Sequence, residues 1–291
     1  MLAHLLLHVG PITPLSERKC AEVAGARQDR AAAIVEDEIS TPSKRSQVAL
    51  VTGAGSGIGQ ATAIAFSSVG YRVALAGRRL ETLEVTATAC GSAETLCVSA
   101  DISQETEVVR MVDRTIERFG RLDAAANCAA VKPAGGVLDL PMSEFDRTIA
   151  TNLRGTWLCV RHQAGAMIEV GGGAIVNVSS ISAVVGGPAD YAAAKAGVEG
   201  LTRAAAEELA PHKIRVNALR AGLFDTPMLH DAWETGSDPE GVLAPGVAAT
   251  MLGRIGDPSE AAAAIVWLCS PASSYVTGTC LDVDGGVLGR W

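Results

Sequence analysis

Seven short, almost wholly apolar runs, separated by longer helical stretches, constrain the fold of this chain more than any other feature. The runs are residues 48–52, 72–76, 95–100, 122–126, 174–179, 214–219 and 280–283. A strand that is apolar throughout has to be buried on both faces, because a half-exposed strand alternates polar with apolar residues. The segments between the runs, such as 60–69, 105–119 and 192–210, are rich in Ala, Glu, Arg and Leu at helical spacing. The pattern predicts an α/β fold, with a doubly wound parallel sheet of about seven strands and helices on both faces.

The first 45 residues differ in composition from the rest of the chain. They carry charges of both signs, three prolines (Pro11, Pro14 and Pro42) and no sustained hydrophobic period. We expect residues 1–45 to be an N-terminal extension, flexible in solution. Residues 46–291 are then expected to form a single domain, since 48% of the 291 residues are hydrophobic and can fill a sizeable core.

Charge and hydropathy exclude several classes of protein. The net charge is −8 and the 24 basic residues are scattered, whereas a nucleic-acid surface needs clustered Lys and Arg. No apolar run approaches the ~18 residues of a membrane span. The short apolar run near the start lacks the basic segment and cleavage site of a signal peptide. We therefore expect a cytoplasmic protein that binds neither nucleic acid nor membrane.

Cysteine and histidine spacing argues against a metal site. The seven cysteines include no C-x-x-C pair and fit buried, reduced thiols. None of the five histidines stands at ligand spacing; they are His4, His8, His162, His212 and His230. No metal is expected.

A glycine-rich stretch, T-G-A-G-S-G-I-G, follows the first predicted strand directly and precedes a predicted helix. Glycines there let the backbone turn sharply and approach a pyrophosphate, whose charge is met by the free N–H groups at the helix N-terminus. The absence of G-K-[ST] argues against a nucleoside-triphosphate loop, and the lack of H-R-D and D-F-G argues against a protein kinase. The stretch predicts a Rossmann-type dinucleotide site formed by Thr52, Gly53, Gly55, Ser56, Gly57, Ile58 and Gly59.

The end of the second predicted strand bears on the choice of cofactor. A dinucleotide fold often carries an acid there that binds the adenosine ribose, but this chain has Arg78 and Arg79. Two guanidiniums favour a 2′-phosphate, and hence NADP(H) over NAD(H). In the alternative, both arginines simply begin the next helix as a solvated face and NAD(H) is used.

Tyr191 and Lys195 stand four residues apart at the start of a helical run, so their side chains share one helix face. A phenol with a pKa of about 10 is a poor acid or base at neutral pH. A nearby ammonium and a positive nicotinamide would lower that pKa. The strand before the pair ends in Ser179 and Ser180, at the carboxyl edge where a parallel sheet exposes functional groups.

With these motifs in this order, residues 46–288 closely resemble the short-chain dehydrogenase/reductase family, in its type with a core of about 250 residues. Five further matching pieces are D-I from Asp101, N-C-A-A from Asn127, T-N-L-R-G from Thr151, R-V-N-A-L from Arg215 and Y-V-T-G-T-C-L-D-V-D-G-G from Tyr275.

The resemblance implies a role for each matching residue. Tyr191 would exchange a proton with the substrate oxygen, and Lys195 would hold the nicotinamide ribose and lower the tyrosine pKa. Ser180 would polarise the substrate carbonyl, and Asn152 would hold a water that links Lys195 to solvent. The remaining cofactor contacts would come from Asp101 and Ile102 at the adenine, Asn127 and Ala129 on the adenosine side, and Gly222, Phe224 and Thr226 near the pyrophosphate and carboxamide.

Three departures from the family pattern stand out. N-C-A-A replaces the usual N-N-A-G, and Arg220 and Ala221 replace the usual x-Pro before Gly222, which leaves that loop less constrained. Only ten residues separate Ser180 from Tyr191, where twelve are more usual. Ser182 and Ser179 are therefore possible substitutes for Ser180.

Residues 226–251 have the mixed, Gly- and Pro-broken pattern of a lid. Met228, Leu229 and Trp233 would form an apolar wall for the substrate, or would only pack the lid itself. The substrate stays open among 3-oxoacyl, steroid-like and sugar-like carbonyls or alcohols.

The sequence thus favours an NAD(P)-dependent oxidoreductase acting on a carbonyl or secondary alcohol. The alternative is a non-catalytic nucleotide-binding or cofactor-sensing module of the same fold. Segments 156–167 and 192–210 are strongly apolar for surface helices, and the family pairs such faces between subunits, so we expect a homodimer or homotetramer.

Overall fold

A computed structural model describes residues 47–132, 135–234 and 245–290. The predicted extension, residues 1–45, lies outside this part of the chain. Seven parallel strands form one sheet in the order β3-β2-β1-β4-β5-β6-β7. They are β1 (Val48–Thr52), β2 (Arg72–Gly77), β3 (Thr95–Ser99), β4 (Ala124–Asn127), β5 (Gly173–Ser180), β6 (Ile214–Ala221) and β7 (Cys280–Val283). The predicted fold class is confirmed, and every predicted strand is present to within two residues at each end.

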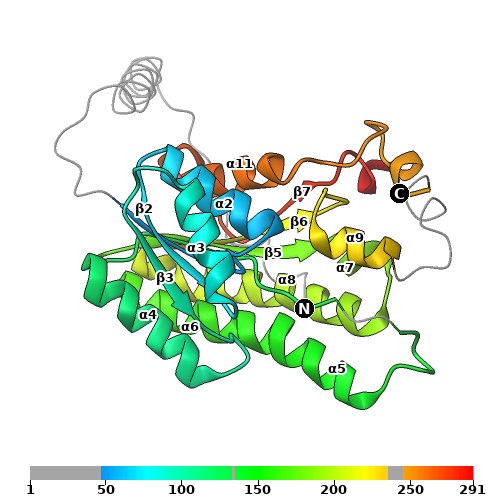
Figure 1. Cartoon of the computed structure of the whole chain (residues 1–291), viewed down its shortest axis with the longest axis horizontal. Coiled ribbons are helices and arrows are strands. Elements are labelled where there is room, and N and C mark those ends of the chain that lie inside the picture. The colour runs from blue at the N-terminus through cyan, green and yellow to red at the C-terminus, as the bar shows by residue number, and fades with distance from the viewer. Residues whose placement is uncertain (1–46, 133–134, 235–244, 291) are drawn as a thin grey trace, which may run out of the picture. The chain divides into compact units, whose positions relative to one another are not determined.

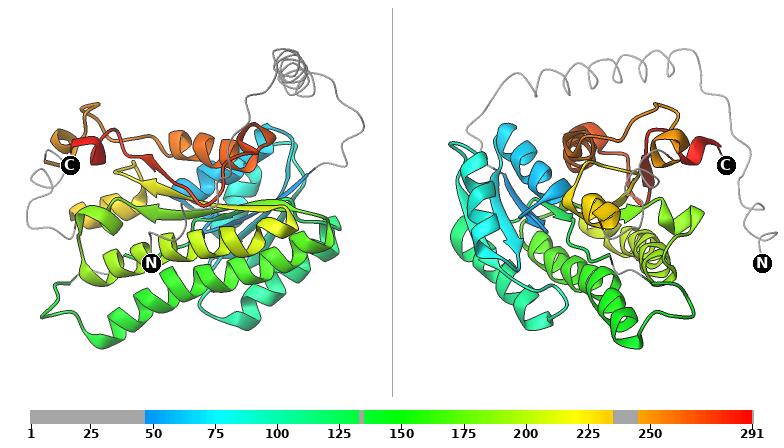
Figure 2. Two further views of the ribbon diagram at one scale, coloured as in Figure 1. Left: turned by 180° about the vertical axis from the view of Figure 1, so that it is seen from behind. Right: turned by 45° about the vertical axis from the view of Figure 1, so that its right-hand side comes forward.

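Helices cover both faces of the sheet (Figures 1 and 2). On one face lie α2 (Gly57–Ser68), α3 (Leu80–Ala89) and α11 (Pro258–Cys269); on the other lie α4 (Glu105–Phe119), α6 (Thr156–Glu169) and α8 (Ala189–Leu209). Each face has its own apolar core. Phe66, Leu83 and Ile265 pack together on the first. Met111 and Leu158 belong to the core on the second face, where they pack against the opposite side of the same sheet.

The helix predictions hold, with an informative shift at two N-termini. Segment 105–119 matches α4, whereas α2 and α8 each begin three residues before the predicted 60–69 and 192–210. In α2 the glycine-rich stretch runs into the helix: Gly57 is its first residue, at a φ of +53° that favours glycine, and the N–H of Gln60 donates to the carbonyl of Ser56 at 3.1 Å.

Shorter elements connect the main helices and strands or close the described part of the chain. They are α5 (Met142–Thr148), the π-helix η2 (Ile149–Gly155), α7 (Ser182–Val185), η3 (Ala210–His212), α9 (Pro227–Glu234), η4 (Pro271–Ser273) and η5 (Leu288–Arg290). The π-helix is a feature that sequence patterns rarely reveal, and such helices are frequent at functional sites.

Strand β1 lies between β2 and β4. Strands β2 and β3 follow on one side of it and strands β4 to β7 on the other, so the order of the strands reverses at β1. Thr52 pairs with Ala76 of β2 on one side and with Asn127 of β4 on the other. This is the switch point of the sheet, where loops separate and leave room for a ligand.

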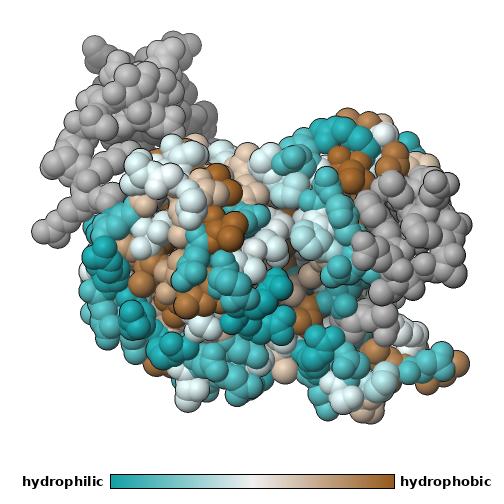
Figure 3. All heavy atoms as spheres, viewed as in Figure 1, coloured by the Kyte–Doolittle hydropathy of each residue, from teal (hydrophilic) through white to brown (hydrophobic). Residues whose placement is uncertain are grey.

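In the space-filling view, polar residues cover most of the visible face and hydrophobic residues form small separate patches (Figure 3). Among the described residues, no helix is both long enough and apolar enough to cross a membrane.

Candidate active site

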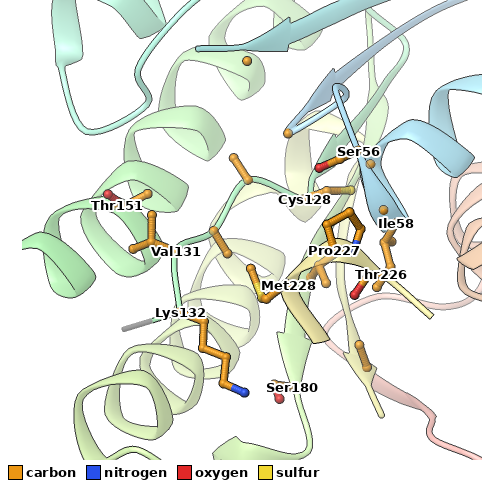
Figure 4. Close-up of a pocket in the computed structure, with 18 of the residues that line it drawn as sticks. Ser56, Ile58, Cys128, Val131, Lys132, Thr151, Ser180, Thr226, Pro227 and Met228 are labelled. Carbon is orange, nitrogen blue, oxygen red and sulfur yellow. The ribbon is translucent and has the colours of Figure 1, made fainter. Parts of the chain in front are cut away.

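A cavity of about 340 Å³ opens at the carboxyl edge of the sheet. It joins the glycine-rich turn, the ends of β2 and β3, the loop after β4, the end of β5, the start of α8, and the segment from β6 into α9 (Figure 4). Seventeen of the twenty predicted site residues line it: Gly53, Gly55, Ser56, Gly57, Ile58, Gly59, Arg78, Arg79, Asp101, Ile102, Ala129, Ser180, Tyr191, Lys195, Gly222, Phe224 and Thr226. The other three, Thr52, Asn127 and Asn152, are buried outside the lining.

Two glycines of the turn leave no room for a side chain. Gly53 is at φ +68°, and a Cβ there would lie 2.8 Å from backbone atoms of Ala129. A Cβ on Gly59 would lie 2.2 Å from the carbonyl oxygen of Gly53. The turn, the loop after β4 and the first turn of α2 are thus in direct backbone contact. This close packing brings the N-terminus of α2 to the cavity wall, where it favours an anion.

Charged side chains are unevenly distributed around the cavity. Arg78 and Arg79, at the end of β2, are exposed at its wall. Among the described lining residues Asp101 is the one acid, and its carboxylate accepts a hydrogen bond from the backbone N–H of Ser103 at 2.9 Å. The cavity is therefore basic overall and suited to an anionic ligand.

Tyr191 and Lys195 share one face of α8, as their spacing predicts. The ammonium of Lys195 lies 5.5 Å from the centre of the Tyr191 ring and donates to the carbonyl oxygen of Val178 at 2.7 Å. Lys195 is almost fully buried, and this burial lowers its pKa to about 8.

The groups of the chain itself do not, on balance, lower the Tyr191 pKa, so the part of the prediction that rests on Lys195 is not seen, while the contribution of a positive nicotinamide stays a prediction. Burial raises the pKa of the phenol to about 12. The opposing effect comes from a hydrogen bond with the Ser180 hydroxyl, not from Lys195. The physical reason is that the ammonium lies over the ring and that desolvation disfavours the charged form of both groups.

Ser180 and Ser179 have different environments although they are neighbours. The Ser180 hydroxyl lies close enough to the phenol to lower its pKa, and it accepts from the backbone N–H of Ser182 at 3.1 Å. The Ser179 hydroxyl is buried and donates to Glu199 on α8 at 3.0 Å. The geometry thus favours Ser180 over Ser179 as the serine that acts with the tyrosine.

The shortened connection between Ser180 and Tyr191 is closed by one helical turn and two glycines. Helix α7 occupies Ser182–Val185, and Gly186 and Gly187 follow at φ +87° and +142° before α8 begins. Ten intervening residues are thus enough to bring Ser180 to the phenol.

Asn152 lies in the π-helix and is fully buried. Its side chain accepts from the N–H of Val131 at 2.8 Å and donates to the carbonyl of Val131 at 2.7 Å. It therefore fixes the loop after β4 next to the cavity. The predicted role in holding a water stays a prediction.

Asn127 belongs to a buried amide network. Its side chain exchanges hydrogen bonds with Gln163 at 3.0 and 2.9 Å and donates to Asn177 at 2.9 Å, and Asn177 continues to Thr202. The network joins β4, β5, α6 and α8. The Thr52 hydroxyl, at the end of β1, accepts from the N–H of Ala129 at 3.3 Å. The predicted cofactor contacts of Asn127 and Thr52 stay predictions.

At the departure N-C-A-A, Cys128 lines the cavity beside Ala129. Burial raises the pKa of its thiol to about 12, which disfavours the reactive thiolate.

An ion-pair network that the sequence motifs did not indicate lies next to Ser179. Arg220, at the end of β6, donates to both carboxylate oxygens of Glu199 at 2.8 Å and also pairs with Asp282 on β7. The loop that lacks the usual proline is therefore tied to α8 and β7 through the side chain of Arg220.

Met228 and Leu229, at the start of α9, line the cavity as an apolar wall. The side chain of Trp233 lies outside the described part of the structure, as do residues 235–244 of the predicted lid. Lining residues that the motifs did not indicate include Thr82 and Lys132. Within the described residues no cluster of three or more His, Cys, Asp or Glu could hold a metal ion.

Comparison with known proteins places these features in a family. The model of the family described as enoyl-(acyl carrier protein) reductase matches residues 53–288. The chain is 42% identical over 241 residues to 2,5-dichloro-2,5-cyclohexadiene-1,4-diol dehydrogenase of Sphingobium indicum, covering 81% of this chain and 95% of that protein. It is 40% identical over 245 residues to cis-4-hydroxycyclohexanecarboxylate dehydrogenase of Sinomonas cyclohexanicum, covering 82% and 96%. The crystal structure of levodione reductase superposes with a TM-score of 0.82 at 34% identity, covering 84% and 98%.

Proposed function

The chain belongs to the short-chain dehydrogenase/reductase family, and we propose that it is an NAD(P)-dependent enzyme interconverting a secondary alcohol and a ketone. The observation that carries the proposal is the convergence of Ser180, Tyr191 and Lys195 at one end of a cavity whose other end is the glycine-rich turn. A non-catalytic module would need the turn but not a phenol, a serine and an ammonium placed together.

The cavity fits a nicotinamide dinucleotide. The two glycines that exclude a Cβ let the backbone approach a pyrophosphate, and Arg78 and Arg79 lie where a phosphate could be bound. When bound, the cofactor would supply or accept the hydride.

The residues of the chain would then handle the proton. In the reducing direction Tyr191 donates its proton to the carbonyl oxygen, and its raised pKa keeps the phenol protonated at neutral pH. Ser180 positions and polarises the same oxygen. Lys195 uses one N–H on the carbonyl of Val178 and has further N–H donors for the ribose hydroxyls.

For the substrate we propose an alicyclic alcohol or ketone. Two relatives are named for six-membered ring alcohols. The wall formed by Met228 and Leu229 is apolar, as a ring would require. A 3-oxoacyl, steroid-like or sugar-like substrate remains the alternative.

For the cofactor we propose NADP(H) over NAD(H). The support is the pair Arg78 and Arg79 at the end of β2, with no acid at that position. Titrations with NADPH and NADH test this, since tighter binding of NADH would contradict it.

We further propose a cytoplasmic homodimer or homotetramer. Six cysteines are free thiols in the described residues. Trp157 and Ile168 on α6 are 43% and 39% exposed, as expected of side chains that a second subunit would cover. A monomer by light scattering at micromolar concentration would contradict the assembly.

The Tyr191→Phe variant tests the function. Turnover with a panel of cyclic ketones should fall by about 10²- to 10⁴-fold, because phenylalanine has no proton to give. NADPH binding should be unchanged, which separates chemistry from folding. Cofactor binding without turnover in both proteins would instead favour the non-catalytic module.

A further inference from the structure

Lys132 lines the cavity but has no part in the mechanism proposed above for Ser180, Tyr191 and Lys195. It follows Val131 in the loop after β4. Its side chain extends toward Ser180, while Ser56 of the glycine-rich turn lies at the opposite side of the view (Figure 4). It is thus at the catalytic end of the cavity.

The base of Lys132 is held in place by the surrounding structure. Both backbone polar groups of Val131, the residue before it, are hydrogen-bonded by the buried side chain of Asn152. The starting point of the side chain is therefore fixed relative to the π-helix, as expected of a residue that has to meet a ligand at a set position.

The charge of Lys132 has no counter-charge in the described structure. No described residue gives its ammonium a hydrogen bond or an ion pair, and the one described acid of the cavity wall, Asp101, is bonded to Ser103. Lys132 is an exposed residue at the cavity wall, and partial burial of its side chain lowers the pKa of the ammonium, so the group is open to a ligand that enters the cavity. An anion at this place would supply the missing counter-charge.

We propose that Lys132 binds a carboxylate carried by the substrate, so that the enzyme acts on an alcohol or ketone that is also a carboxylic acid. The inference rests on the proposed function, because the acid has to lie beside the carbon held between Ser180 and Tyr191. A carboxylate matches the single positive charge of one lysine, whereas a phosphate carries ~1.5 to 2 negative charges and calls for several donors. The phosphates of the cofactor belong to the opposite end of the cavity, at the glycine-rich turn.

Binding of an unreactive pair of probes tests the inference. Cyclohexanecarboxylate and cyclohexanecarboxamide are titrated by calorimetry into the enzyme–NADPH complex of the wild type, Lys132→Met and Lys132→Arg. We expect the wild type to bind the acid about 10- to 100-fold more tightly than the amide, as for a hydrogen bond to a charged group. Lys132→Met should lose this preference and keep its affinity for the amide, and Lys132→Arg should retain most of it.

Lys213→Met is the matched control. Lys213 is an exposed lysine outside the cavity, and its backbone at φ +59° is strained equally by lysine and methionine. The Lys213→Met variant should bind the acid more tightly than the amide by the same factor as the wild type. Equal affinities of the wild type for acid and amide, or an unchanged preference in Lys132→Met, would overturn the inference.

Turnover separates this inference from the proposed function. With 3-oxocyclohexanecarboxylate and its methyl ester as substrates, Lys132→Met should reduce kcat/KM for the acid by about 10- to 100-fold and affect the ester little. Turnover of the ester without preference for the acid overturns the role of Lys132 alone. Absence of turnover with every ketone tested would contradict the proposed function as an oxidoreductase.

Discussion

The two ends of the cavity are built in different ways. The centre of the cofactor end is one contiguous stretch, Thr52 to Gly59, and it depends on backbone atoms: a positive φ at Gly53 and a Cβ-free contact at Gly59. The catalytic end comes from side chains on separate elements, Ser180 on β5, Tyr191 and Lys195 on α8, and Lys132 after β4. The turn at the cofactor end is formed mainly by neighbours in the sequence, whereas the catalytic end brings together side chains from elements that are far apart in the sequence.

This difference separates binding from chemistry. Backbone N–H groups recognise what all dinucleotides share and have no protonation state to adjust. Side chains at the catalytic end have pKa values that depend on burial and on neighbouring groups. Burial raises the pKa of Tyr191 to about 12 and lowers the pKa of Lys195 to about 8. We therefore expect variants at the catalytic end to change rates and pH profiles, and variants at the cofactor end to change affinity.

After Tyr191→Phe, the largest effect is expected from Ser180→Ala. Loss of a hydroxyl that bonds the reacting oxygen should lower kcat by about 10²- to 10³-fold, with little change in NADPH affinity. The pKa of Tyr191 should also rise further, because the bond with Ser180 lowers it. Alcohol oxidation needs the phenolate, so its rate should increase with pH and the increase should move to higher pH in the variant.

Ser182→Ala is the control, since Ser182 lines the same cavity but contacts Ser180 through its backbone N–H. A fall in rate that is equal in both variants would remove the distinction between these serines. A fall in NADPH affinity equal to the fall in rate would remove the distinction between the two ends.

Arg220→Met tests whether the catalytic end depends on distant elements. The Arg220–Glu199 pair is mostly buried, and removing one partner leaves the other uncompensated. We expect the free energy of unfolding to fall by about 2–3 kcal/mol, below the ~3–5 of a fully buried pair because Asp282 keeps the network in contact with water. Denaturant titration measures the change.

Arg254→Met provides the comparison. Arg254 forms the same kind of bidentate contact with Glu260, at 2.8 and 2.7 Å, but on the surface. Its loss should change stability little, because water screens exposed pairs. Adding Glu199→Gln to Arg220→Met should restore part of the lost stability. If the double variant is less stable than Arg220→Met, the uncompensated charge is not the cause.

The cofactor end is tested by Gly59→Ala. The added methyl group would overlap the carbonyl oxygen of Gly53, so we expect a loss of about 1–3 kcal/mol in stability together with weaker NADPH binding. Gly165→Ala on α6 is the matched control, since a Cβ there meets nothing within 4 Å and alanine favours the helix. The two substitutions should therefore shift stability in opposite directions, and a shift in the same direction would show that the close backbone contact is unimportant.

The same contrast explains what could be predicted from the sequence. The apolar runs predicted the strands to within two residues because a buried strand needs several apolar residues in succession. The glycine-rich turn could be predicted because it, too, is formed by consecutive residues. The Arg220–Glu199 pair, the Asn127–Gln163 pair and the position of Lys132 depend on registers between distant elements, which no local pattern encodes. Helical spacing placed Lys195 beside Tyr191 but could not give the burial that raises the pKa of the phenol.

Arg78→Ala should have the smallest effect, and its size follows from where the charge lies. Arg78 is exposed at the cavity wall, so its attraction for a 2′-phosphate acts largely through water and is screened by salt. We expect NADPH affinity to fall about tenfold and NADH affinity to stay the same, with the difference shrinking as salt is raised. Arg114→Ala, on the exposed face of α4, is the control. A preference for NADH that survives Arg78→Ala would refute the cofactor assignment. That result would not affect the role proposed for the glycine-rich turn, because the turn binds the pyrophosphate that the two cofactors share, whereas the arginine only discriminates between them.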